Sequence, residues 1–181
     1  MNASEFLLVL SGCAPSIENL SRFGYPPGIV AEFHGSYFAK SRAGQEAIAD
    51  DPLLDLVTRY DASSITIGMV KFSARPFESE IGWIVGNDEA ELILIERESG
   101  EVQVRETGKE WYVASRCAAT SAKFLDSMAL VACFSARCLV DPELDADNEG
   151  KRHRAAKCAA LAGGEQYLAF YENALGVRND A

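Results

Sequence analysis

Positive charge is scarce in this sequence. Its 181 residues include 17 Lys and Arg against 27 Asp and Glu, which gives a formal net charge of −10 and an isoelectric point near 4.7. A chain of this charge is repelled by phosphate backbones and attracted by cationic surfaces. We therefore expect no direct binding to nucleic acid.

Long apolar runs and internal repeats are also absent from the sequence. A membrane-spanning helix needs about 20 mostly apolar residues, so no membrane partner is expected. The content of 48% apolar and 24% charged residues is that of an ordinary folded domain, and the length suffices for one core. We predict a single domain over residues 1–181, in which residues 141–150 form an acidic linker to a C-terminal helical pair.

Cysteines with the spacing of a metal or redox motif are missing. The sequence has five cysteines and no C-x-x-C: Cys13, Cys117, Cys133, Cys138 and Cys158. Cys133 and Cys138 are five residues apart on a predicted helix, so they point about 140° apart and cannot chelate one ion together. We predict free thiols, a cytoplasmic location, and no metal or cofactor.

One cysteine does fall in a recognisable motif, because residues 10–13 spell a bacterial lipoprotein cleavage box. The apolar run before it covers only residues 6–10, and Glu5 precedes it in place of a cationic segment. A signal peptide needs a positive segment and about 7 to 15 apolar residues. We therefore predict a first helix with Ser4 as N-cap. Its core-facing residues would be Phe6, Leu7, Leu8 and Leu10.

Motifs of the common enzyme chemistries are missing as well. The two histidines lie outside any protease context, and neither a G-x-S-x-G elbow nor a glycine-rich phosphate loop occurs. Asp145, Asp147 and Glu149 begin like a calcium loop. The twelfth position is Ala156, however, which cannot supply the required carboxylate. We expect a solvated acidic segment there.

The middle of the chain has the pattern of a sheet. Five short apolar or alternating segments cover residues 64–70, 81–85, 91–96, 101–105 and 110–114. Most are separated by four or five residues, which permits only antiparallel neighbours. Residues 92–95 are apolar on both faces and are predicted to be a central strand, while Gly100 and Gly108 close tight turns. Alternation predicts a further, half-buried strand at residues 29–38.

Helical spacing is found on both sides of these strands. It predicts helices at residues 16–23, 43–60, 120–139, 151–162 and 165–175. In the long helix, Leu130 and Phe134 share the sector of the charged residues, so we expect its middle turns to be covered on every side. Together the elements predict an α+β fold, with a central antiparallel meander sheet of about five to six strands flanked by N-terminal and C-terminal helices.

Carboxylates flank the predicted strand that carries Trp83. They are Glu78, Glu80, Asp88, Glu89 and Glu91. One interpretation is a solvated sheet rim, since acidic residues are common at sheet edges and in hairpin loops. Another is a pair of catalytic acids for glycosidic chemistry.

Residues 83–104 resemble the central hairpins of the SUKH superfamily of immunity and regulatory proteins, which is related to fungal cell-wall-synthesis regulators. The features that match are an apolar strand that ends in Gly86-Asn87-Asp88, a core strand at residues 92–96, and an acid-rich turn that ends in Gly100 before Val102. Phe124 and Leu125 resemble the family's Phe-Leu segment, and Tyr25-Pro26-Pro27 is similar to its Gly-x-Pro turn.

This resemblance implies a non-enzymatic cytoplasmic protein that neutralises a toxin, commonly a nuclease or nucleotide-directed enzyme, by binding it. The net charge favours a cationic protein toxin as the partner. The predicted partner-binding residues are Glu78, Glu80, Trp83, Asp88 and Glu89. Trp83 would be an anchor if its ring is exposed and a core residue otherwise. Two alternatives stay open: a small enzyme that uses an acidic cleft near Trp83, and a self-assembling structural or regulatory protein.

Overall fold

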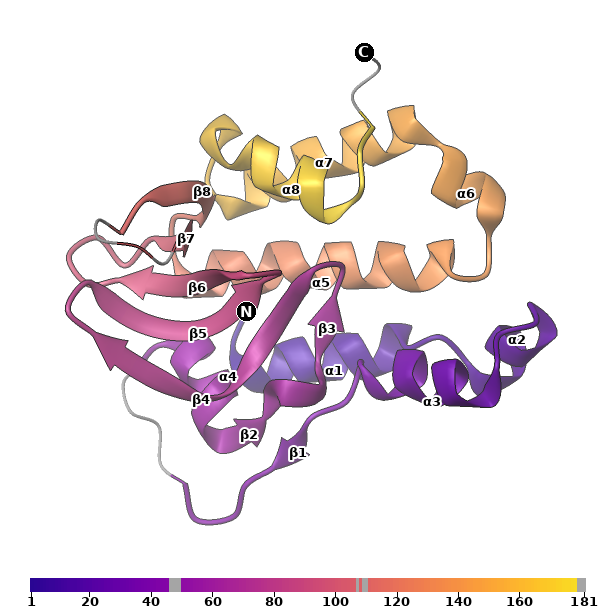
Figure 1. Ribbon diagram of the computed structural model, residues 1–181, viewed down its shortest axis with the longest axis horizontal. Coiled ribbons are helices and arrows are strands. Elements are labelled where there is room, and N and C mark those ends of the chain that lie inside the picture. The colour runs from indigo at the N-terminus through magenta and orange to yellow at the C-terminus, as the bar shows by residue number, and fades with distance from the viewer. Residues whose placement is uncertain (46–49, 107, 109–110, 179–181) are drawn as a thin grey trace.

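The computed structural model describes residues 1–45, 50–106, 108 and 111–178, and it confirms the α+β fold (Figure 1). The helices are α1 (Ala3–Cys13), α2 (Ile17–Arg22), α3 (Pro27–Gly35), α4 (Pro52–Arg59), α5 (Ser121–Cys138), α6 (Pro142–Ala146), α7 (Asn148–Ala162) and α8 (Leu168–Ala174), with 3-10 turns η1 (Ala62–Ser64) and η2 (Glu165–Tyr167). The strands are β1 (Lys40–Ser41), β2 (Tyr60–Asp61), β3 (Thr66–Ile67), β4 (Val70–Ser79), β5 (Gly82–Asp88), β6 (Glu91–Glu96), β7 (Val102–Arg105) and β8 (Val113–Ala118).

The main sheet is a meander of six strands in the order β3-β4-β5-β6-β7-β8, each antiparallel to the next. β6 lies between β5 and β7, which confirms the predicted central strand. Ile93 and Ile95 point into the main core, while the fully buried Leu94 points to the opposite face. Gly100 closes the turn after β6 with φ 71°, as predicted.

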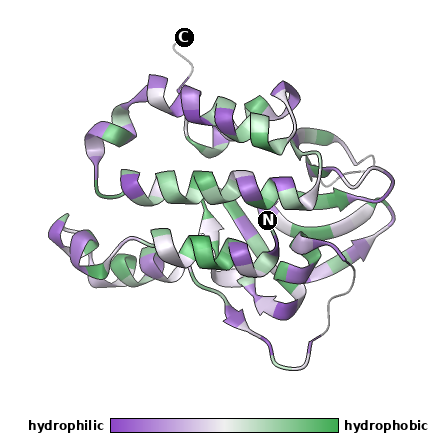
Figure 2. Ribbon diagram, turned by 180° about the vertical axis from the view of Figure 1, so that it is seen from behind, coloured by the Kyte–Doolittle hydropathy of each residue, from purple (hydrophilic) through white to green (hydrophobic). Residues whose placement is uncertain are grey.

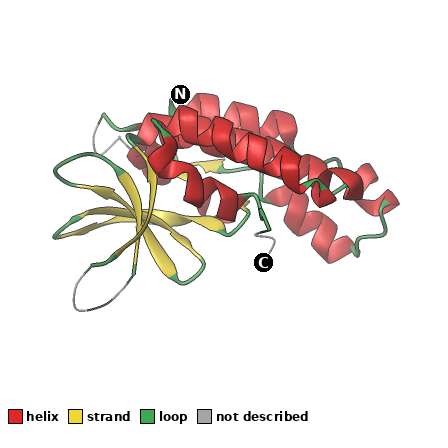
Figure 3. Cartoon of the chain, turned by 90° about the horizontal axis from the view of Figure 1, so that it is seen from above, coloured by secondary structure: helices red, strands yellow, loops and turns green. Residues whose placement is uncertain are grey.

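The helices gather along one side of the sheet (Figure 3). α5 runs through their centre, with α1 on one flank and the α7–α8 pair on the other (Figure 1). Buried hydrogen bonds join these layers: the Tyr171 hydroxyl donates to the Cys117 carbonyl at 2.9 Å, and Ser127 donates to the Cys158 carbonyl at 2.9 Å. The C-terminal pair therefore covers α5 as expected.

The predicted strand at residues 29–38 is wrong, because most of this segment forms α3. Pro27 occupies the first turn of the helix, where its fixed φ is favourable and its missing N–H costs nothing. The apolar residues fit a helix as well as a strand, since the buried Val30 and Tyr37 are seven residues apart with Phe33 between them.

Four smaller expectations also need correction. The N-cap of α1 is Asn2, whose side chain accepts from the Glu5 N–H, and Leu8 on that helix is 73% exposed. α4 is shorter than predicted and begins at Pro52; the predicted residues 46–49 lie outside the described residues. The segment 64–70 turns back at Gly68 into β4, a ten-residue strand that was not predicted.

The long helix α5 begins after Thr120, one of the two predicted caps, but its middle turns are not covered on every side. Phe134 is buried beneath the Arg154 guanidinium, which lies 4.4 Å from the ring centroid, whereas Leu130 is 45% exposed. Seen from behind the view of Figure 1, the helices carry apolar and polar residues intermixed (Figure 2). In the part of the chain that the structure describes, no helix has the length and apolar character to span a membrane.

Candidate functional site

The structure divides the predicted acidic residues between the two ends of β5. Glu78 pairs with Trp83 across β4 and β5, and Glu80 lies in the turn between these strands. Asp88 pairs with Glu91 at the far end of β5, and Glu89 lies in the next turn. Trp83 and Asp88 are five residues apart on β5, or about 17 Å at 3.3 Å per residue. The predicted surface is therefore two acidic regions rather than one.

The first region, the β4–β5 end, has its own cation. Arg97 lies 3.0 Å from the Glu78 carboxylate and also donates to the Ser79 carbonyl at 2.8 Å. Trp83 is half-buried and packs against the core, so its ring belongs to the fold more than to the surface. At this end Arg97 compensates the charge of Glu78, while Glu80 is exposed in the turn.

In the second region Asp88, but not Glu89, lines a cleft of about 450 Å³, which we call the acidic cleft. Three carboxylates reach it: Asp88, Glu91 and Glu106. Glu91 and Glu106 lie on the same side of the sheet because β6 begins beside the end of β7, where Leu92 pairs with Arg105. Helix α8 completes the wall with the buried Phe170 and the exposed Asn173, while β8 contributes Ser115.

Charge in the acidic cleft is not compensated by its own walls. Among the described residues that line it, none is Lys or Arg. Burial raises the pKa of Asp88, and the neighbouring charges of Glu89 and Glu91 raise that pKa further. Glu89 also has φ 51°, a left-handed conformation that is unfavourable for a residue with a Cβ, and its carbonyl accepts from the Asn87 side chain at 2.8 Å. The ionised form of Asp88 is thus unfavourable in the free protein.

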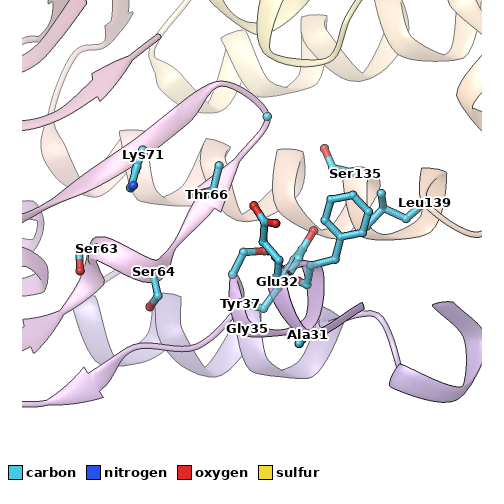
Figure 4. A pocket seen from close by; sticks show the side chains of 13 residues that line it. Ala31, Glu32, Gly35, Tyr37, Ser63, Ser64, Thr66, Lys71, Ser135 and Leu139 are labelled. Carbon is cyan, nitrogen blue, oxygen red and sulfur yellow. Dashed lines mark hydrogen bonds between the residues drawn. The ribbon is translucent and has the colours of Figure 1, made fainter. Parts of the chain in front are cut away.

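A larger cleft of about 540 Å³ lies between α3, the β3–β4 hairpin and the end of α5 (Figure 4). Glu32 stands on the helical wall, and Lys71 stands on the strand wall. Ser63, Ser64, Thr66 and Ser135 also line it. The floor is apolar, with Phe33, Tyr37 and Leu139. Such a cleft suits a ligand that carries charges of both signs.

The sequence did not reveal this larger cleft. Its helical wall was predicted as a strand, and its strand wall includes part of β4, which was not predicted. The proline at the first turn of α3 was the available signal for the helix. Nothing in the local sequence indicates that α3 and β3 face each other.

Metal and acid–base constellations are limited in the described part of the chain. No group of three or more His, Cys, Asp or Glu side chains there could hold a metal ion. In the segment that resembles half a calcium loop, Asp145 binds Lys151 at 2.8 Å and Asp147 caps α7 by accepting from the Gly150 N–H at 2.9 Å. Residues 141–150 thus carry α6 and the first turn of α7.

Comparison with known proteins identified no relative: no family model matches the chain, and no curated protein or solved structure matches it. The family resemblance therefore stays a prediction from residues 83–104 and the segments around them.

Proposed function

We propose that this protein is a SUKH-type immunity protein, a non-enzymatic cytoplasmic module that neutralises a cationic, nuclease-type toxin by binding it. The observation that carries the proposal is the acidic cleft, which Asp88, Glu91 and Glu106 line without a lysine or arginine among the described lining residues. The net charge of −10 adds long-range attraction for a basic partner.

A lysine or arginine of the toxin fits the cleft on electrostatic and geometric grounds. In the free protein the ionised Asp88 is destabilised by burial and by its acidic neighbours, and a bound cation removes this cost. Ser115 and Asn173 add hydrogen-bond acceptors at the rim.

Neutralisation then needs no catalytic step. A nuclease holds its substrate with cationic side chains, and an acidic protein that occupies those side chains competes directly with phosphate. Opposite fields mainly raise the rate of association, so the rate should fall with salt as the Debye length shortens from about 10 Å at 0.1 M to about 3 Å at 1 M.

The test is the association rate with the toxin encoded beside this protein's gene, measured by stopped flow. We expect the triple variant Asp88→Asn, Glu91→Gln, Glu106→Gln to associate at least about tenfold more slowly than the wild type. The matched control Glu18→Gln, Glu143→Gln, Glu165→Gln removes the same charge from exposed sites on other elements and should change the rate less than about threefold. Equal rates for the two variants would contradict the assignment of the acidic cleft.

A second variant separates the two ends of β5. Glu78→Lys with Glu80→Lys reverses charge at the β4–β5 end, where Arg97 already compensates Glu78. We expect the association rate to fall less than it does for the cleft variant, even though each Glu→Lys reversal changes the charge by two. A larger loss would move the docking site to the β4–β5 end, and absence of any complex with the neighbouring gene product would contradict the immunity function.

A further inference from the structure

The larger cleft, between α3, the β3–β4 hairpin and the end of α5, shares no described lining residue with the acidic cleft. It is hollow because both of its walls carry small residues. Ala31 and Gly35 lie four residues apart on one face of α3, and Gly68 lies at the turn of the hairpin. A Cβ added to Gly35 would meet no atom of the facing walls within 4 Å. The volume of about 540 Å³ is in the range of small-molecule sites, about 300 to 1,000 Å³.

One charged residue of each sign lines this space. Among the described lining residues, Glu32 on the helical wall and Lys71 on the strand wall are the only charged ones (Figure 4). Neither side chain forms an ion pair or a hydrogen bond with another described residue, so the two charges do not neutralise each other. Both are therefore available to a ligand that carries a positive and a negative charge at separate ends.

The Lys71 end of the cleft has the donors that a carboxylate needs. Thr66 pairs directly with Lys71 across β3 and β4, so the two side chains lie on the same face of the hairpin, about 5 Å apart at Cβ. The Thr66 hydroxyl forms no hydrogen bond with another described residue. An ammonium and a hydroxyl side by side can donate to the two oxygens of one carboxylate. On the opposite wall, the Glu32 carboxylate is an acceptor for an ammonium group.

The floor of the cleft is apolar, and its rings are held in place. Phe33 packs edge-on against Tyr25, with ring centroids 5.4 Å apart, and the Tyr37 hydroxyl donates to the Ala132 carbonyl at 3.1 Å. Leu139 completes the floor. Because these contacts fix the rings before a ligand arrives, little conformational entropy is lost on binding. Apolar side chains of a ligand can be buried on this floor.

We propose that the larger cleft binds a zwitterionic small molecule, a dipeptide of apolar residues, with its carboxylate at Lys71 and Thr66 and its ammonium at Glu32. A single amino acid fits less well, because its two charged groups are attached to one carbon, whereas Glu32 and Lys71 stand on opposite walls and do not pair. This binding is independent of toxin neutralisation, since the two clefts share no described lining residue.

The test is isothermal titration calorimetry on the full chain, with leucyl-leucine as the probe. Blocking either charge of the probe should weaken binding at least about fivefold, so N-acetyl-leucyl-leucine and leucyl-leucine amide should both bind less tightly. In Lys71→Gln, leucyl-leucine and its amide should have affinities equal within about twofold, and in Glu32→Gln the same should hold for leucyl-leucine and its N-acetyl derivative. These equalities separate the loss of a charge contact from a steric effect of the blocking group.

A further variant tests the space itself. Gly35→Leu places a side chain in the cleft and should weaken the binding of leucyl-leucine at least about tenfold. Gly28→Leu is the matched control, because it makes the same change about two turns earlier on α3, in open space and outside the cleft, and it should bind like the wild type. The Lys71 and Glu32 variants, at exposed residues, test the proposal independently of how Gly35→Leu folds.

Three results would overturn the proposal. One is a wild-type protein that shows no saturable binding of leucyl-leucine up to about 10 mM. Another is equal affinity of the wild type for leucyl-leucine and its two blocked derivatives, and the third is equal affinity of folded Gly35→Leu and Gly28→Leu for leucyl-leucine.

Discussion

The two ends of β5 carry the same kind of residue in the same kind of turn, yet their carboxylates are in opposite electrostatic states. At the β4–β5 end, Arg97 binds Glu78, and the adjoining turn after β6 gives Glu96 three donors: Ser99 Oγ at 2.6 Å, Ser99 N at 2.7 Å and Glu98 N at 3.1 Å. These bonds, with that of the Ser99 hydroxyl first, hold the pKa of Glu96 below its ordinary value. In the acidic cleft, burial and like charges raise the pKa of Asp88.

This difference teaches that a run of acidic residues does not define a binding surface. The two ends differ in their supply of donors. In the turn after β6, backbone N–H groups bind the Glu96 carboxylate, whereas Asp88 is partly buried beside the like charges of Glu89 and Glu91. Hydrogen bonds stabilise the charge of Glu96 without removing it, whereas a cationic partner would relieve the cost that burial and like charges impose on ionised Asp88.

The largest effect is expected at Leu94, which lies on β6 between the two ends and is fully buried. Leu94→Asp should lower the free energy of unfolding by about 3 to 5 kcal/mol, because it removes apolar burial and buries a carboxylate. The measurement is urea denaturation at pH 7. Leu161→Asp, at a site 45% exposed on α7, is the control and should cost less than about 1 kcal/mol. Equal urea midpoints for Leu94→Asp and Leu161→Asp would contradict the central, buried position of β6 in the sheet.

Much of this sheet could be predicted, since short connections between apolar segments leave few arrangements besides an antiparallel meander. β4 could not, because Pro76 and exposed charge interrupt its pattern. The pairing of β4 with β5 shifts register between Phe72 and Phe77, and such irregularities are where a strand tolerates proline.

The acidic cleft was only half predictable. Asp88 and Glu91 stand out because they flank the turn that follows an apolar strand in sequence. Glu106 joins them only through the register of β6 and β7, and Phe170 and Asn173 join through the docking of α8.

A smaller effect is expected from Ser99→Ala at the β4–β5 end. Because the Glu96 pKa is lowered in the folded protein, its hydrogen bonds stabilise the fold above the unfolded pKa of about 4.3, and this stabilisation is lost as pH falls through the folded pKa. The variant should therefore lose about 0.5 to 1 kcal/mol at pH 7, with a smaller deficit below pH ~4. Urea midpoints across this pH range measure it. Ser11→Ala, which removes a bond to the Leu8 carbonyl, should show a deficit independent of pH.

The smallest effect, and the one that bears most directly on the cleft, is expected from Asp88→Asn. A carboxyl whose pKa is raised on folding destabilises the fold when ionised, and that cost disappears as pH falls through the raised pKa towards the unfolded value of about 3.9. Asp88→Asn should thus be more stable than the wild type at pH 7, by up to about 0.5 kcal/mol, with the two curves converging near pH 4. Glu78→Gln at the other end should show no gain, because it removes the partner of Arg97. Urea denaturation of both variants at pH 7 and pH 4 makes the comparison. A loss of stability at pH 7 in Asp88→Asn would mean that donors already satisfy this carboxylate, and the acidic cleft would then have no uncompensated charge with which to hold a cationic partner.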